Sequence, residues 1–135
     1  MDCYLLYKPM RIVIIDDNHT ELITIKKVLE KFFARQEKDC KIFIFQDIQT
    51  LIDNLLAVNP DIAIIDIVLH YEKDAGFKLK KLLDKNNITT ILMSGYPDVY
   101  LKDKNIELYK YDYQKIIRKP FMVEQIYSMI TEALS

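Results

Sequence analysis

Short apolar runs alternate with longer amphipathic segments along the chain. The apolar runs are rich in β-branched residues and nearly free of charge, which is the pattern of parallel strands buried on both faces. They predict five strands, at about 11–16, 41–46, 61–66, 88–93 and 116–119.

The segments between and after these runs carry large apolar residues at helical spacing, which predicts a helix after each strand. Asn18 or Thr20 is expected to cap the first helix and Asp47 the second. The first predicted helix is residues 19–36, and the second runs from Asp47 through Leu51, Leu55 and Leu56 to a stop before Pro60. The others are one from Phe77 to Asn86 after a polar loop over 70–76, a short one after Pro97, and a last one with Phe121, Ile126, Ile130 and Leu134 on one stripe. Five strand–helix units in a row favour an α/β fold, a doubly wound parallel sheet with right-handed crossovers.

The composition is that of one globular domain. Of the 135 residues, 50% are hydrophobic and 29% are charged, which is the composition of a globular protein. A chain of this length suits one core and is too short for two. We therefore expect a single domain over 1–135, with a core of about 11–134 and a short leader over 1–10. The formal net charge of −1, from 19 basic and 20 acidic residues, gives no basic excess for nucleic acid.

Two features favour a cytoplasmic protein. Cys3 and Cys40 are the two cysteines, which argues against a disulfide scaffold and fits a reducing compartment. The N-terminus lacks the basic start and apolar stretch of a signal peptide, and no apolar run approaches the ~18 residues that a membrane span needs. We expect no membrane partner.

Three acids, a hydroxyl and a lysine follow the predicted strands. Asp16 and Asp17 close the first apolar run, Asp66 closes the third, Ser94 follows the fourth and Lys119 follows the fifth. Singly, each could be a cap, a turn residue or a solvated side chain. In an open parallel sheet, however, the carboxyl ends of the strands share one edge, where ligands bind. We therefore expect these side chains to meet in a crevice that can hold a divalent cation and a phosphoryl group.

These five units, with the acids, the serine and the Lys119-Pro120 pair in this order, resemble the receiver domain of two-component response regulators from about Arg11 to Leu134. The resemblance implies a flavodoxin-like doubly wound sheet of five parallel strands in the order 2-1-3-4-5, with five helices. It implies a signalling phosphoprotein rather than an enzyme. A sensor histidine kinase or a histidine phosphotransfer protein would supply the phosphoryl group, and an unidentified output protein would bind the face from strand four to helix five.

The resemblance also assigns a metal site. Asp66 would be the phosphoacceptor; Asp17 and Asp66, with the backbone carbonyl of Val68, would bind Mg²⁺, or Mn²⁺ in its place, and Asp16 would act mainly through bound water. Physical chemistry agrees, because three carboxylates within a few ångströms do not all stay ionised without a cation, and Mg²⁺ prefers hard oxygen ligands.

The same resemblance assigns two groups to the phosphoryl group. Lys119 would pair with one phosphoryl oxygen, and the Ser94 hydroxyl would donate to another. The family uses a cis Lys-Pro bond to direct the lysine inward, although cis is a minority state at such bonds. Positioning and charge neutralisation carry most of phosphoryl transfer.

Three positions depart from the family pattern. Ile116 stands where the family usually has an aromatic residue that rotates inward on phosphorylation, so that switching here must use other groups. Val68 and Tyr96 occupy positions that flank the path of the hydrolytic water. An apolar side chain and a bulky ring there predict slow self-dephosphorylation.

Other polar and aromatic residues could have either a structural or a functional role. Tyr109, Tyr111 and Tyr113 alternate with polar residues, which indicates an extended segment that either covers the sheet edge or binds a partner. His19 and His70 are expected to be exposed rather than metal ligands.

Three other classes remain as alternatives. The first is a receiver-like interaction domain that signals without phosphorylation. The second is a phosphatase of the haloacid dehalogenase type, in which Asn18 would stand at the position of the general acid/base. The third is a flavodoxin-like cofactor module, which the absence of a glycine-rich phosphate loop disfavours.

Overall fold

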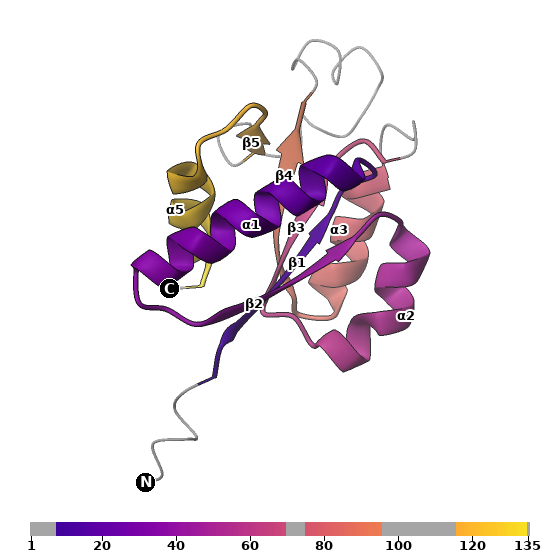
Figure 1. The fold of residues 1–135 in the computed structure, drawn as a ribbon. Helices are drawn as coiled ribbons and strands as arrows, with labels where there is room; N and C mark the ends of the chain where they lie inside the picture. The colour runs from indigo at the N-terminus through magenta and orange to yellow at the C-terminus, as the bar shows by residue number, and fades with distance from the viewer. Residues whose placement is uncertain (1–7, 70–74, 96–115, 135) are drawn as a thin grey trace, which may run out of the picture.

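The computed structural model describes residues 8–69, 75–95 and 116–134, and these form one parallel sheet with helices on both faces (Figure 1). The five strands lie in the order β2-β1-β3-β4-β5, and each neighbouring pair is parallel. The strands are β1 Met10–Ile15, β2 Cys40–Phe45, β3 Ile62–Asp66, β4 Thr89–Ser94 and β5 Ile116–Arg118. The predicted strand order is confirmed, and no strand bound differs from its predicted position by more than one residue.

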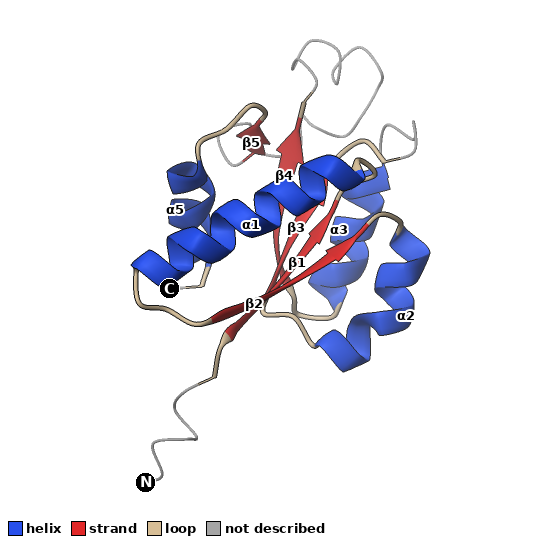
Figure 2. Ribbon diagram, in the orientation of Figure 1, coloured by secondary structure: helices blue, strands red, loops and turns tan. Residues whose placement is uncertain are grey.

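Four helices lie in the described residues: α1 His19–Arg35, α2 Ile48–Val58, α3 Ala75–Lys85 and α5 Val123–Ala133. Figure 2 shows α1 and α5 on one side of the sheet and α2 and α3 on the other. The helix predicted after Pro97 lies in 96–115, outside the described residues, as do Tyr96, Tyr109, Tyr111 and Tyr113. None of the helices in the described ranges is long and apolar enough to cross a membrane.

Alternation along the strands divides the core into two layers. Ile12 and Ile14 of β1 pack with α1 and α5, whereas Val13 and Ile15 pack with α2 and α3. All five residues of β3 are buried, because this central strand has a helix layer on each face. The carboxyl ends of the apolar strands therefore lie together at one edge of the sheet.

Local hydrogen bonds fix where the helices begin. The Asn18 side chain accepts from the backbone N–H of Glu21 at 3.0 Å, so Asn18 rather than Thr20 caps α1. Asp47 caps α2 by accepting from the Thr50 N–H at 2.8 Å, as expected.

Three details of the predicted helices are wrong. Gly76 was assigned to the loop before the third helix but lies in α3, because this helix begins at Ala75 against the end of β3. Leu56, which was placed in the apolar series of α2, is 97% exposed because the buried side of this helix carries Leu51 and Val58. The last predicted stripe is shorter, since Ile126 and Ile130 are its buried residues, whereas Phe121 precedes α5 and Leu134 follows it.

Candidate functional site

Asp16 directly follows β1 and is 1% exposed. Its backbone N–H donates to the Phe45 carbonyl at 3.1 Å, which continues the ladder with β2. Its Oδ1 accepts from the Asn18 N–H at 3.0 Å, and its Oδ2 accepts from Lys119 Nζ at 2.7 Å. Both oxygens therefore have a donor, and the carboxylate has a fixed orientation at the sheet edge.

Asp66 is the last residue of β3 and is 6% exposed. Its Oδ1 accepts from the Val68 N–H at 3.3 Å and its Oδ2 from Lys119 Nζ at 2.9 Å. The chain after Asp66 packs closely against the start of α3, where the Gly76 N–H donates to the Ile67 carbonyl at 2.9 Å. A Cβ on Gly76 would lie 2.4 Å from the Asp66 carbonyl oxygen and 2.6 Å from the Ile67 Cα, so a glycine is required at this close approach.

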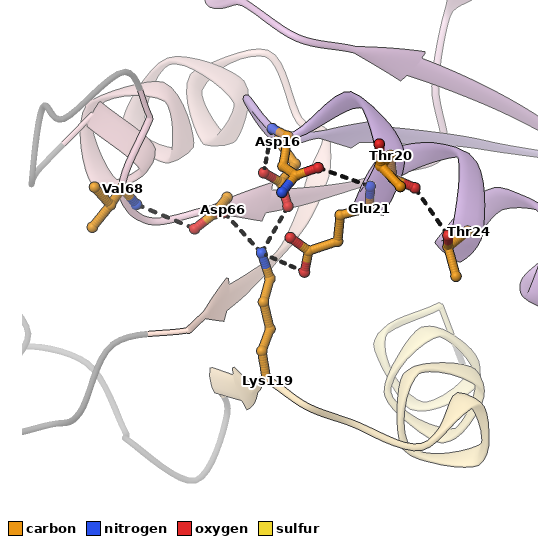
Figure 3. A network of polar contacts seen from close by, with 8 residues as sticks. Asp16, Thr20, Glu21, Thr24, Asp66, Val68 and Lys119 are labelled. Carbon is orange, nitrogen blue, oxygen red and sulfur yellow. Dashed lines mark hydrogen bonds and ion pairs between the residues drawn. The ribbon is translucent and has the colours of Figure 1, made fainter.

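Lys119 connects the two buried acids. It follows β5, its backbone N–H donates to the Ser94 carbonyl at 2.8 Å, and its peptide bond to Pro120 is cis, as expected. The side chain is 13% exposed and extends across the crevice to Asp16 and Asp66, and Glu21 lies 2.9 Å from its Nζ as a third carboxylate partner (Figure 3).

The burial of these groups perturbs their protonation. Burial raises the pKa of Asp66 to about 7, and the repulsion from Asp16 adds to that effect, whereas Lys119 and the Val68 N–H act in the opposite direction. The pKa of Lys119 is raised even though burial lowers it, because Asp66 is the strongest of the groups that favour the charged ammonium. A pKa near 7 means that Asp66 is not fully ionised at neutral pH when Lys119 is its only cation.

The acids meet the requirements of a divalent cation. One oxygen from each of Asp16, Asp17 and Asp66 lies within 4.8 Å of the others, and Asp17 is more exposed than its two neighbours. Hard oxygen donors at a partly solvated site suit Mg²⁺, which keeps several waters and takes one or two carboxylates from a protein.

A cavity of about 270 Å³ opens onto these residues. Its lining consists of Asp16, Asp17, Asn18, Glu21, Asp66, Val68, Gly95 and Lys119. Ser94, at the end of β4, is 1% exposed and is not among the lining residues, although its carbonyl holds the Lys119 backbone. The structure thus brings the predicted acids and the lysine together in one crevice.

Two further residues bear on the site. Ile116 is 5% exposed and packs into the core layer on the side of α2 and α3. Glu21 was not among the predicted site residues, yet it lines the crevice and contacts Lys119. His19 is exposed at the start of α1, and His70 lies outside the described residues.

The fold is similar to that of solved receiver domains. A CheY-like response regulator receiver domain protein from Methanospirillum hungatei is 20% identical with a TM-score of 0.70, and the match covers 94% of each chain. The chain has the receiver fold. The signal receiver domain of an HD domain-containing protein from Pseudomonas fluorescens matches at 20% identity and a TM-score of 0.70, over 94% of this chain and 95% of that one.

This chain also matches the solved structure of a two component transcriptional regulator AraC from Clostridium phytofermentans. The identity is 21%, the TM-score is 0.70, and the match covers 93% of this chain and 92% of that one. No protein-family model and no curated protein matches the sequence. Because identities near 20% establish the receiver fold alone, the function must be argued from the residues in the crevice.

Proposed function

We propose that this chain is a phosphoacceptor receiver, a cytoplasmic signalling domain that takes a phosphoryl group onto Asp66 from a phosphohistidine of a sensor kinase or a histidine phosphotransfer protein. The observation that carries the proposal is the position of Asp66. Its carboxylate ends the central strand, faces a cavity of about 270 Å³, and has a lysine ammonium at 2.9 Å and two further acids beside it.

The transfer needs a nucleophile and charge balance. An Asp66 oxygen attacks phosphorus, an O–P bond forms, the P–N bond to the donor imidazole breaks, and the imidazole takes up a proton as it leaves. Asp66 must be ionised to attack, which its pKa of about 7 allows only in part without a further cation. The product carries roughly −1.5 to −2 charge on the phosphoryl group. Among the described residues, Lys119 supplies the positive charge beside it.

Asp16, Asp17 and Asp66 would hold Mg²⁺, or Mn²⁺ in its place, together with the Val68 carbonyl. When bound, the metal supplies the positive charge that keeps the carboxylates ionised and neutralises phosphoryl oxygens. Asp16 would act mainly through bound water, since both of its oxygens already accept hydrogen bonds. Ser94 would donate its hydroxyl to a phosphoryl oxygen.

The output would be a protein contact through the face from β4 to α5. Within the described chain this face includes β5, whose buried Ile116 replaces the usual aromatic residue. The phosphoryl group would shift an existing equilibrium between two arrangements of this face, as expected for a ligand that favours one state. We propose no turnover of a substrate by this domain.

Intact-mass spectrometry after incubation with acetyl phosphate and Mg²⁺ tests the proposal. We expect a mass gain of one phosphoryl group that Asp66→Asn and a chelator each abolish. Asp53→Asn is the matched control, because Asp53 is an exposed acid on α2 that accepts from Gln49. A wild-type protein that gains no phosphoryl group would contradict the proposal and favour an interaction domain that works without phosphorylation. Release of phosphate from a phosphate ester at a catalytic rate would favour a phosphatase instead.

A further inference from the structure

Lys119 has no hydrogen-bond donor to spare in this structure. An ammonium group has three N–H donors. Its Nζ lies 2.7 Å from Asp16 Oδ2, 2.9 Å from Asp66 Oδ2 and 2.9 Å from Glu21 Oε1 (Figure 3). A phosphoryl oxygen can therefore bind Lys119 only in exchange for one of these three carboxylates.

Glu21 points toward Lys119 because another acid has taken its usual partner. A glutamate three residues after an N-cap commonly accepts from the backbone N–H of the cap residue, which closes a capping box. Here the Asn18 N–H donates to Asp16 Oδ1 at 3.0 Å instead. The Glu21 carboxylate is thereby released from the end of α1, lines the crevice and reaches the ammonium.

The three carboxylates differ in how easily they give up Lys119. The side chains of Asp16 and Asp66 are 1% and 9% exposed, so neither can replace the ammonium with bulk water. The Glu21 side chain is 33% exposed and can be hydrated once it is released. Glu21 is therefore the contact that exchanges at the lowest free-energy cost.

We infer that Glu21 is a positioning residue that competes with the phosphoryl group for Lys119 and so restrains phosphorylation at Asp66. This inference rests on the proposed function and adds a contact that favours the unphosphorylated state. Glu21 acts through the lysine and does not touch the reacting atoms. Its removal leaves Lys119 with one free donor directed into the crevice.

The test uses two probes on the full chain. Beryllofluoride, a mimic of the phosphoryl group, is titrated at saturating Mg²⁺ and followed by fluorine NMR, and Mg²⁺ alone is titrated by calorimetry. We expect Glu21→Gln to tighten beryllofluoride binding roughly fivefold, which is the upper range for a partly exposed ion pair. Mg²⁺ binding should be unchanged or weaker, because a negative charge has been removed nearby.

Two variants separate the contact from other effects. Glu30→Gln changes the net charge equally on the exposed part of α1 and should bind both probes as wild type does. Glu21→Asp keeps the charge but is one methylene shorter, so it should tighten beryllofluoride binding as Glu21→Gln does. Thermal unfolding of each variant without probes confirms that it is folded.

Three outcomes overturn the inference alone. Wild-type affinity in Glu21→Gln shows that Glu21 does not compete, and wild-type affinity in Glu21→Asp shows that charge alone acts. Weaker binding of both probes shows a structural role for Glu21. If wild-type protein binds beryllofluoride and Asp66→Asn does not, the proposed function stands whatever Glu21 does. If wild-type protein binds none, the proposed function and the inference both fail.

Discussion

Replacing Asp66 with asparagine should stabilise the protein at pH 8 when a chelator removes divalent cations. At this pH the folded state must hold an ionised Asp66 at a site where the residue is 6% exposed and lies near Asp16. The unfolded chain keeps the same carboxylate in water at no such cost. Asparagine has no charge to bury, and its side-chain oxygen can still accept from the Val68 N–H.

The magnitude follows from the pKa of Asp66, which is raised from 3.8 to about 7. At 1.36 kcal/mol for each pKa unit, the cost of ionised Asp66 in the folded state is up to about 4 kcal/mol. This figure already includes the favourable contact with Lys119. Since neighbouring groups relax, we expect Asp66→Asn to raise the free energy of unfolding by roughly 2–4 kcal/mol.

The sign of the pH dependence follows from the same shift. Between pH 3.8 and 7 the folded state keeps a proton on Asp66 that the unfolded state has lost. Stability therefore falls as the pH rises through this window, which is opposite to the behaviour of a carboxylate with a depressed pKa. The advantage of Asp66→Asn should be small at pH 4 and reach its full value above pH 7.

Urea denaturation in a chelating buffer from pH 4 to pH 8 measures these differences. Asp53→Asn, on the exposed side of α2, should change the free energy of unfolding by less than about 0.5 kcal/mol at each pH. The reasoning is refuted if Asp66→Asn is less stable than wild type at pH 8, or if its advantage does not grow with pH.

The remaining predictions use paired positions and the same denaturation assay at one pH. Gly76→Ala should lower the free energy of unfolding by about 2–4 kcal/mol, because its Cβ would lie 2.4 Å from a backbone oxygen at the end of β3. This cost outweighs the higher helix propensity of alanine. Gly95→Ala should be tolerated, since the nearest atom to its Cβ would be 3.7 Å away. Leu51→Ala should cost about 2–5 kcal/mol and Leu56→Ala close to none, since Leu51 is fully buried and Leu56 is 97% exposed on the same helix. Asn18→Ala should cost about 1 kcal/mol through loss of the α1 cap.

The sheet could be predicted because its strands are buried on both faces. A strand such as Ile62–Asp66 must be apolar at every position, and that requirement is visible in the sequence without knowledge of its neighbours. The acids and Lys119 could be placed at one edge for the same reason, since each follows such a run. The start of α3 could not be predicted in this way, because Gly76 belongs to the helix through a close approach to the chain after β3.

The contact between Glu21 and Lys119 depends on which group binds the Asn18 N–H, and spacing alone does not predict it. The spacing of Asn18 and Glu21 fits a capping box, and only the structure shows that Asp16 has taken the Asn18 N–H. Local spacing suggests a capping box, and the contacts in the folded chain decide which group the Glu21 carboxylate binds.

The charges in the crevice connect the stability and the chemistry of this domain. Among the described residues that line the crevice, one lysine stands against four carboxylates, from Asp16, Asp17, Glu21 and Asp66, so these residues carry three excess negative charges when fully ionised. Asp66→Asn and a bound divalent cation are two ways to relieve the same repulsion, and their stabilising effects should therefore not add.

Saturating Mg²⁺ at 100 times its Kd stabilises a protein by about 2.7 kcal/mol. Wild type should gain this amount, whereas Asp66→Asn at the same Mg²⁺ concentration should gain clearly less. Equal gains would show that the cation and Asp66 do not share one site.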